Sequence, residues 1–235
     1  MIRKAVILAA GRGTRMGDYT VDTPKAMLPV RGRPMLEHVL DGLASVGIEQ
    51  FLVVTGYRRE MVEEYFGKWR LPVEFRVQET LDGTGSATRL ARDFGANDPF
   101  LLTFADILCP PAAYTLCANT LTDNPATLAV MGVKDVDDPW QGAAVYEQQG
   151  VVTRVVEKPP QGTSTTRWNS AGLYSMSPHV FPYLDRLEKS PRGEYELTDI
   201  FTMMLNEGRE VRISAIEGAW RDVGRPEDLA AAETL

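Results

Sequence analysis

The first chemistry that the sequence suggests is phosphate binding, at a glycine-rich turn that begins near residue 11. A strand-like run over Ala5–Ala9 leads into the segment Ala-Ala-Gly-Arg-Gly-Thr-Arg-Met-Gly at residues 9–17. Glycines at the carboxyl end of a first strand let backbone amides approach phosphate oxygens closely. A purely structural turn would leave the basic side chains Arg12 and Arg15 without a role. The segment therefore favours an anion site.

Two familiar nucleotide-binding loops do not match this turn. A dinucleotide fold has the spacing G-x-G-x-x-G, but after Gly11 and Gly13 the third glycine, Gly17, arrives one place late. That fold also places an acidic residue at the end of its second strand, where this chain has Thr55 and Gly56. The P-loop string G-x-x-x-x-G-K-[S/T] does not occur in the sequence.

Two aspartates stand at positions suited to chemistry. Asp106 follows the apolar run Phe100–Phe104, at the edge where α/β sheets place their ligand sites. Asp222 lies in a segment that reads Trp-Arg-Asp-Val-Gly-Arg-Pro-Glu-Asp-Leu over residues 220–229. Each has a structural alternative, because Asp106 could cap a following helix and the segment around Pro226 would start a helix well.

The elements that must position these residues alternate along the first half of the chain. Apolar periodicity predicts strands over 5–9, 51–54, 73–77 and 100–104, with helices over 34–46, 59–66 and 85–94 between them. After residue 124 short strands follow one another over 127–131, 143–146, 151–156 and 173–175, then helices over 197–206 and 226–234 flank a strand over 210–216. This order predicts an α/β fold.

We expect one domain over residues 1–235, with a Rossmann-like, mostly parallel sheet and a mixed or antiparallel lobe inserted after the fourth strand. The chain has 235 residues, 44% of them hydrophobic and 24% charged, as in ordinary globular proteins. The net charge of −7 argues against nucleic acid as a partner. Residues 1–33 nevertheless carry seven basic and two acidic side chains, which suits a small polyanion.

No apolar run reaches the length of a membrane span, so we expect no membrane partner. Cys109 and Cys117 lack the paired spacing of a metal site, which favours a reduced, cytoplasmic setting. His38 and His179 lie away from every motif, and we interpret both as structural or surface residues. The oligomeric state cannot be read from the sequence.

The residues Leu8–Met16, followed by Thr23–Val30, closely resemble the signature of the sugar-1-phosphate nucleotidyltransferases. The resemblance implies that Leu8, Ala10, Gly11, Gly13, Thr14 and Arg15 bind a nucleoside triphosphate. It also implies catalytic roles for Arg15 and Lys25, as phosphate-binding cations, and for Asp106. We expect Arg15 and Lys25 to lie in an exposed loop. Their separation is similar to that of the glucose-1-phosphate branch rather than the N-acetylglucosamine-1-phosphate branch.

The segment Gln78–Ala87 resembles the base-reading segment of the uridylyl- and thymidylyltransferases. The amide of Gln78 can accept from the ring N–H of uracil or thymine and donate to a ring carbonyl. Gly83 would bring the backbone close to the base, and Thr84 belongs to the same segment. The resemblance thus indicates UTP or dTTP as the nucleotide.

The resemblance implies that Asp106 and Asp222 bind Mg²⁺, which is usually held by one or two carboxylates, phosphate oxygens and water. Ala105 departs from the family pattern, where glycine is usual. Some N-acetylglucosamine-type relatives carry Asn at the position of Asp222. We expect the two carboxylates to meet because the carboxyl ends of parallel strands share one edge of a sheet.

The second half of the chain resembles the sugar-binding part of the family. The resemblance assigns Gly142, Glu157, Lys158, Asn169 and Arg192 to the sugar and its phosphate. It divides the domain into a nucleotide-binding part, about 1–123, and a sugar-binding lobe with the closing metal-ligand segment, about 124–235.

The predicted function is transfer of a nucleoside monophosphate from UTP or dTTP to a sugar 1-phosphate, with release of pyrophosphate. One alternative is a guanylyl- or cytidylyltransferase acting on mannose 1-phosphate, heptose 1-phosphate or another phosphorylated alcohol. Another is a catalytically silent regulatory subunit that binds nucleotide sugars.

Overall fold

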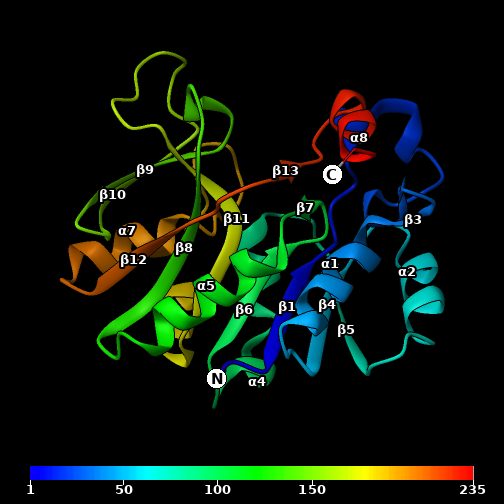
Figure 1. Cartoon of the computed structure of the whole chain (residues 1–235), viewed down its shortest axis with the longest axis horizontal. Helices are drawn as coiled ribbons and strands as arrows, with labels where there is room; N and C mark the ends of the chain where they lie inside the picture. Colours follow the sequence, from blue (N-terminus) through cyan, green and yellow to red (C-terminus); the bar gives the residue numbers. More distant parts are fainter. Residues whose placement is uncertain (235) are drawn as a thin grey trace.

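The first strand of the chain lies inside one large sheet. A computed structural model describes residues 1–234; Leu235, the last residue of the predicted domain, lies outside the described residues. Within that part of the chain nine strands form the sheet (Figure 1). Their order across it is β5 (Val73–Val77), β4 (Gln50–Thr55), β1 (Lys4–Leu8), β6 (Phe100–Phe104), β11 (Trp168–Met176), β8 (Thr127–Asp135), β12 (Glu210–Ala215), β10 (Val151–Glu157) and β9 (Ala143–Gln148).

The sheet has a parallel half and a mixed half. Strands β5, β4, β1 and β6 pair in parallel. Strand β11 is antiparallel to β6 and β8, β12 is parallel to β8, and β10 is antiparallel to β12 and β9. The predicted α/β fold is confirmed, with the parallel strands first and the mixed strands after them.

Helices cover both faces of the sheet, which explains the apolar runs of its inner strands β4, β1 and β6. On β1, Ala5 and Ile7 pack on one face and Val6 and Leu8 on the other. The first face is covered by α1 (Met35–Ser45), α2 (Arg59–Phe66) and α5 (Pro111–Thr122). The second is covered by α3 (Thr84–Arg89), α4 (Arg92–Gly95), α6 (Phe181–Asp185) and α7 (Asp199–Asn206).

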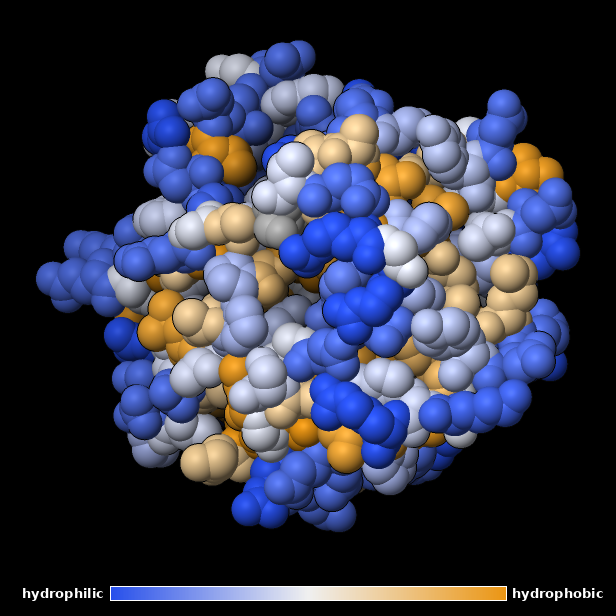
Figure 2. All heavy atoms as spheres, turned by 45° about the vertical axis from the view of Figure 1, so that its right-hand side comes forward, coloured by the Kyte–Doolittle hydropathy of each residue, from blue (hydrophilic) through white to orange (hydrophobic). Residues whose placement is uncertain are grey.

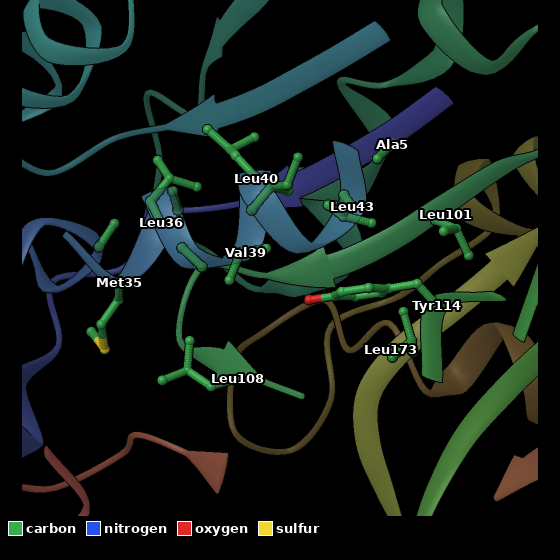
Figure 3. Packing of buried hydrophobic residues seen from close by; sticks show 14 of the residues in the cluster. Ala5, Met35, Leu36, Val39, Leu40, Leu43, Leu101, Leu108, Tyr114 and Leu173 are labelled. Atoms are coloured by element: carbon green, nitrogen blue, oxygen red, sulfur yellow. The ribbon is translucent and has the colours of Figure 1, made fainter. Parts of the chain in front are cut away.

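Helix α1 shows how the pattern of the sequence produces this packing. Leu36, Val39, Leu40 and Leu43 recur every three or four residues and form one buried stripe. In Figure 3 the ring of Tyr114 of α5 reaches toward α1, on the side of the helix where Val39 and Leu43 lie. A Cβ on Gly42 would come within 3.0 Å of the Tyr114 ring, so glycine allows the two helices to approach.

Several predicted elements differ in length from the structure. The helix predicted over 85–94 is two helices, α3 and α4, because Ala91 leaves the helical conformation at φ −84° and ψ 3°. The helices predicted over 34–46, 197–206 and 226–234 correspond to α1, α7 and α8 (Pro226–Ala232). The observed ends differ from the predicted ends by at most two residues. Strands β8 and β11 extend well beyond 127–131 and 173–175.

Helix α5 was not predicted, although Pro111 stands at its start, a common place for proline. Its buried residues include Ala113 and Cys117, which carry a weak hydrophobic signal. Two short ladders were also missed. They are β2 (Pro29–Val30) with β3 (Arg33–Pro34), and β7 (Ile107–Leu108) with β13 (Arg221–Asp222).

Apolar residues are scattered among hydrophilic ones on the surface that Figure 2 shows. The longest helix among residues 1–234 is α5, with 12 residues, whereas a membrane-spanning helix needs about 20. No described helix is therefore long enough, and apolar enough, to cross a bilayer.

Candidate active site

A cavity of about 800 Å³ opens at the carboxyl ends of β1 and β6 and extends to the ends of β9 and β10. It is lined by Leu8–Arg15, by residues 104–107 at and after the end of β6, by Gly142 and Glu157, and by Arg192, Glu194 and residues 196–198. Every site residue predicted from the sequence lines this cavity except Asn169. Residues up to 214 positions apart in the chain, Leu8 and Asp222, therefore face one space.

Glycine is favoured at positions 11 and 13 of the turn for two different structural reasons. Gly13 adopts φ +66°, and a Cβ there would lie 3.0 Å from the Cβ of Lys25, so the protein itself requires glycine. A Cβ on Gly11 would meet no described atom within 4 Å, so glycine there leaves space in the cavity. The turn is anchored by the fully buried Met16 and by the Thr20 hydroxyl, which donates to the Gly13 carbonyl at 3.0 Å.

Asp106 and Asp222 are brought together by the β7–β13 ladder. Asp222 pairs with Ile107, and the Val223 amide donates to the Asp106 carbonyl at 3.0 Å. Only Asp106 follows a strand of the large sheet, at the end of β6. We expected the two carboxylates to meet because both would end strands of one sheet. That reason is wrong for Asp222, which lies in β13, a two-residue strand outside the large sheet.

The two carboxylates differ in how their negative charge is compensated: Asp106 has a cationic partner in direct contact, whereas Asp222 has none among the described residues. The Lys25 ammonium forms an ion pair with the Asp106 carboxylate. Its side chain is only 13% exposed, so the expectation of an exposed loop is wrong for Lys25, although Arg15 is exposed. Partial burial, and then the neighbouring Asp106 carboxylate, raise the pKa of Asp222 to about 6, while Lys25 and Arg15 act in the opposite direction.

These carboxylates suit a hard divalent cation. Residues 1–234 contain no cluster of three or more His, Cys, Asp or Glu side chains that could hold a metal alone. Mg²⁺ usually takes one or two carboxylates and completes its octahedron with phosphate oxygens and water. The pKa of Asp222 is raised first by desolvation and then by the Asp106 carboxylate, and a bound cation would offset both effects. The two-carboxylate set therefore fits a metal that arrives with a phosphate ligand.

In the part of the cavity predicted to bind the base, Gln78 is almost buried, at 8% exposed. Its Nε2 donates to the Gly83 carbonyl at 2.9 Å and to the Ser86 hydroxyl at 2.7 Å. Both amide protons are thus used within the protein, so the expected donation to a ring carbonyl is not available in this conformation. Its Oε1 accepts no hydrogen bond from any residue of the described chain, and the side chain lines the cavity.

The glycine at position 83 is explained by packing. Gly83 has φ +123°, and a Cβ there would lie 2.4 Å from the carbonyl oxygen of Tyr195. The Gly85 amide also donates to that carbonyl at 2.8 Å. The base-side segment is thus pressed against the segment that carries Arg192.

On the sugar side, Gly142, Lys158 and Asn169 form one contact group. The Lys158 amide donates to the Gly142 carbonyl at 2.7 Å, and Lys158 adopts the left-handed φ of +44°. A Cβ on Gly142 would lie 2.3 Å from the Oδ1 of Asn169. Asn169 stands behind Gly142 instead of facing the cavity, and within the described structure its buried Oδ1 has no hydrogen-bond partner.

Glu157 and Arg192 lie within a cluster of carboxylates. Thr198 donates to Glu157 at 2.9 Å, and burial, together with the charge of Glu196, raises the pKa of Glu157. The Arg192 guanidinium lies 2.8 Å from Glu196, 3.2 Å from Glu194 and 3.8 Å from Glu157. Glu196 and Thr198 also line the cavity and were not predicted, although both lie within six residues of Arg192, which was.

The histidines lie outside the cavity. His38 Nε2 is 2.7 Å from the Val30 carbonyl oxygen, and His179 is exposed. Cys109 and Cys117 are both free thiols.

Comparison with known proteins decides the family. The model of the nucleotidyl transferase family matches residues 4–235. The chain belongs to this family. The sugar-1-phosphate nucleotidyltransferase resemblance found in the motifs is thereby confirmed.

Named members of the family are similar over almost the whole chain. The low-salt glycan biosynthesis nucleotidyltransferase Agl11 of Haloferax volcanii is 31% identical over 99% of the chain, which spans 65% of that protein. UTP–glucose-1-phosphate uridylyltransferase AglF of the same organism is 31% identical over 98% of the chain and 95% of AglF. The bifunctional protein GlmU of Methanococcus maripaludis is 31% identical over 98% of the chain, which spans 53% of GlmU.

Solved nucleotidyltransferases share the fold. A UDP-glucose pyrophosphorylase in complex with UDP-glucose superposes with a TM-score of 0.89 at 22% identity, over 100% of this chain and 98% of that one. A proposed glucose-1-phosphate thymidylyltransferase of Bacillus anthracis, crystallised with sucrose, gives 0.86 at 28% identity, over 98% and 94%.

Proposed function

We propose that this nucleotidyltransferase transfers a nucleoside monophosphate from UTP or dTTP to a sugar 1-phosphate, giving a nucleoside diphosphate sugar and pyrophosphate. The observation that carries the proposal is that one cavity is lined by Gln78, by the carboxylates of Asp106 and Asp222, and by Glu157 and Arg192. A nucleotide and a phosphorylated sugar need a base contact, a site for phosphate and its metal, and polar contacts for hydroxyls, and all three kinds of residue face this space.

In the proposed reaction, an oxygen of the sugar phosphate attacks the α-phosphorus of the nucleotide. A new phosphorus–oxygen bond forms, the bond between the α-phosphorus and the bridging oxygen breaks, and pyrophosphate leaves with that electron pair. A phosphate monoester is already anionic, so no general base is needed. Arg15, Lys25 and the amides of the glycine turn would stabilise charge on the departing pyrophosphate.

We propose Mg²⁺ as the cofactor, held by Asp106 and Asp222. When bound, it would neutralise phosphate charge at the reacting centre. The free protein balances Asp106 with the Lys25 ammonium. Lys25 thus lies where it can exchange a carboxylate partner for a phosphate oxygen as the substrates bind.

The residues that line the cavity indicate which part of the chain would bind each substrate. We propose that residues 1–123 bind the nucleotide and that residues 124–235 bind the sugar phosphate and close the metal site. Gly142, Lys158 and Arg192 would hold the hexose and its phosphate, and Glu157 would accept bonds from its hydroxyls. Asn169 would act by supporting Gly142, because its Oδ1 lies against that residue. Free thiols at Cys109 and Cys117 suit a reduced, cytoplasmic setting.

Two relatives bear on the nucleotide. AglF is named for UTP and glucose 1-phosphate, and the chain spans 95% of its length. An inositol-1-phosphate CTP transferase shares the fold at 20% identity, which leaves a cytidylyltransferase as the alternative. Gln78 favours UTP or dTTP over CTP, because its free amide oxygen can accept from the ring N–H at position 3 of uracil and thymine, where cytosine has an acceptor. A regulatory subunit without activity would have no need of Asp106, Asp222, Arg15 and Lys25 together.

A direct test is a panel of UTP, dTTP, CTP and GTP against several sugar 1-phosphates, with Mg²⁺ present and pyrophosphate release measured. We expect turnover with UTP or dTTP to exceed turnover with CTP and GTP. Equal or faster turnover with GTP or CTP would overturn the assignment. The absence of pyrophosphate release with every pair, in a folded protein that binds nucleotide, would instead support the regulatory alternative.

A further inference from the structure

The amide of Gln78 is held in one of two possible orientations. A glutamine amide carries an acceptor oxygen and a donor nitrogen of nearly equal size, so a free one can rotate and exchange them. Rotation would let one side chain serve different bases, because uracil and thymine present a donor at ring position 3 and cytosine presents an acceptor there. Whatever fixes the amide therefore fixes which bases fit.

The partners of Gln78 permit one orientation only. The Ser86 hydroxyl has a single proton, which it donates to Asp82 Oδ1 or to the Gly83 carbonyl at 3.0 Å. A carboxylate and a carbonyl can only accept, so toward Gln78 the Ser86 oxygen must act as the acceptor. The Gly83 carbonyl, 2.9 Å from Nε2, is a second acceptor facing the same nitrogen. A rotated amide would place Oε1 against two acceptors.

We propose that Ser86, with its proton held by Asp82 or Gly83, is a positioning residue that directs Gln78 Oε1 into the cavity and thereby makes the site favour uracil and thymine over cytosine. The inference rests on the proposed function and names a determinant of its selectivity. Cytosine is rejected because its ring nitrogen would face the Gln78 oxygen, acceptor against acceptor. Ser86 itself does not line the cavity, so it acts on the base through Gln78.

A merely structural role for Ser86 makes a different prediction. Ser86 lies in the first turn of α3, where its bond to Gly83 could serve only to hold the helix end. Loss of that support would lower catalysis with every nucleotide in the same proportion. Loss of the orienting bond would change the ratio between nucleotides. The ratio of kcat/KM for UTP to that for CTP therefore separates the two roles.

The experiment compares wild type with Ser86→Ala and Ser86→Cys at a saturating sugar 1-phosphate and Mg²⁺. Both variants remove a good acceptor, and the cysteine nearly conserves the volume, so at least one should keep the fold. We expect the UTP-to-CTP ratio to fall about threefold to tenfold, the effect of one net hydrogen bond. Circular dichroism and Tm verify the fold of each variant.

Two controls complete the design. Ser86→Thr keeps the hydroxyl and should retain the ratio. Thr88→Val removes another hydroxyl from α3, one that bonds only to the Thr84 carbonyl, and should also retain it. An unchanged UTP-to-CTP ratio in folded Ser86→Ala or Ser86→Cys, with wild type preferring UTP, would overturn this inference and leave the proposed function standing. A wild type that prefers CTP or GTP would overturn both.

Discussion

At the scale of single residues, Asp222 carries a charge that the free protein stabilises poorly. Asp222 is exposed at the cavity wall, but the surrounding protein partly desolvates its carboxylate, and this desolvation and the Asp106 carboxylate raise its pKa from 3.8 to about 6. Between those values the folded protein binds a proton more tightly than the unfolded chain does. The contribution of this group to the free energy of unfolding therefore declines as the pH rises from about 4 through 6.

Asp222→Asn removes that charge, so in EDTA we expect the variant to be more stable than wild type at pH 7.5. The two Tm values should approach each other at pH 5, where Asp222 is protonated in the fold. At the same time the variant should lose nearly all turnover with Mg²⁺. Thermal unfolding from pH 5 to 8 checks the first part, and pyrophosphate release checks the second. A lower Tm for the variant at pH 7.5 would show that the carboxylate is a structural group.

Arg15 and Lys25 should respond differently to truncation. Arg15 is exposed, so Arg15→Ala should keep the wild-type Tm while turnover falls about 10²–10³-fold, as for loss of one charge stabiliser. Lys25 neutralises Asp106 in the free protein, so Lys25→Ala should lower turnover similarly and lower the Tm as well. Kinetics and calorimetry on both variants in parallel make this comparison. Equal Tm values would mean that the Lys25–Asp106 ion pair contributes nothing to stability.

At the scale of elements, the end of β10 holds Lys158 in a left-handed conformation, at φ +44°. For a residue with a side chain this conformation costs about 1–2 kcal/mol, whereas glycine adopts it freely. Glycine carries an entropic cost of about 0.5–1 kcal/mol in the unfolded chain. The balance favours glycine at this position. A lysine there suggests that the ammonium group is retained for the cavity.

Lys158→Ala and Lys158→Gly both remove the ammonium, but only glycine relieves the backbone strain. We expect Lys158→Gly to unfold about 2–4 °C above Lys158→Ala, which corresponds to about 1 kcal/mol in a chain of this size. Both variants should show a similarly raised KM for the sugar 1-phosphate. Differential scanning calorimetry and steady-state kinetics provide the two readouts. A normal KM in either variant would remove Lys158 from the substrate site.

The elements that the sequence predicted well are those with long apolar runs. Strands β1 and β6 and helix α1 each bury a continuous or periodic stripe, which is visible without the fold. Helix α5 was missed because its buried face is built partly from alanine and cysteine. The β7–β13 ladder has two residues on each side, too few for any periodicity, and yet it determines where Asp222 lies.

The residues of the candidate site also fall into those that the sequence could predict and those that it could not. Motif residues such as Gly13 and Asp106 could be identified because the family signature is continuous in the sequence. Ser86 and Glu196 bond to residues close to them in the sequence, Asp82 and Arg192 among them, but which atoms meet depends on how each loop folds. Their contacts therefore leave no recognisable spacing in the sequence. Gly83 shows the limit most clearly, since its glycine is required by the Tyr195 backbone, which is 112 positions away in the sequence.

At the scale of the whole molecule, the base-side and sugar-side segments of the cavity are joined by hydrogen bonds. The Tyr195 amide donates to the Asp82 carbonyl at 2.8 Å, and the Gly85 amide donates to the Tyr195 carbonyl at 2.8 Å. The Leu197 amide donates to the Thr84 hydroxyl at 3.1 Å. Ordering of one segment by its ligand should therefore order the other, because they share these bonds.

We therefore predict that nucleotide and sugar 1-phosphate bind cooperatively, each raising the affinity for the other about fivefold or more, within the usual range of coupling. Calorimetric titration of a sugar 1-phosphate, with and without a UTP analogue that cannot be cleaved at the α-phosphorus, measures the coupling factor. Thr84→Val removes the side-chain bond between the segments and should bring the factor toward one, whereas Thr84→Ser should preserve it. Equal coupling in the valine variant and wild type would show that the two sites communicate through the substrates alone.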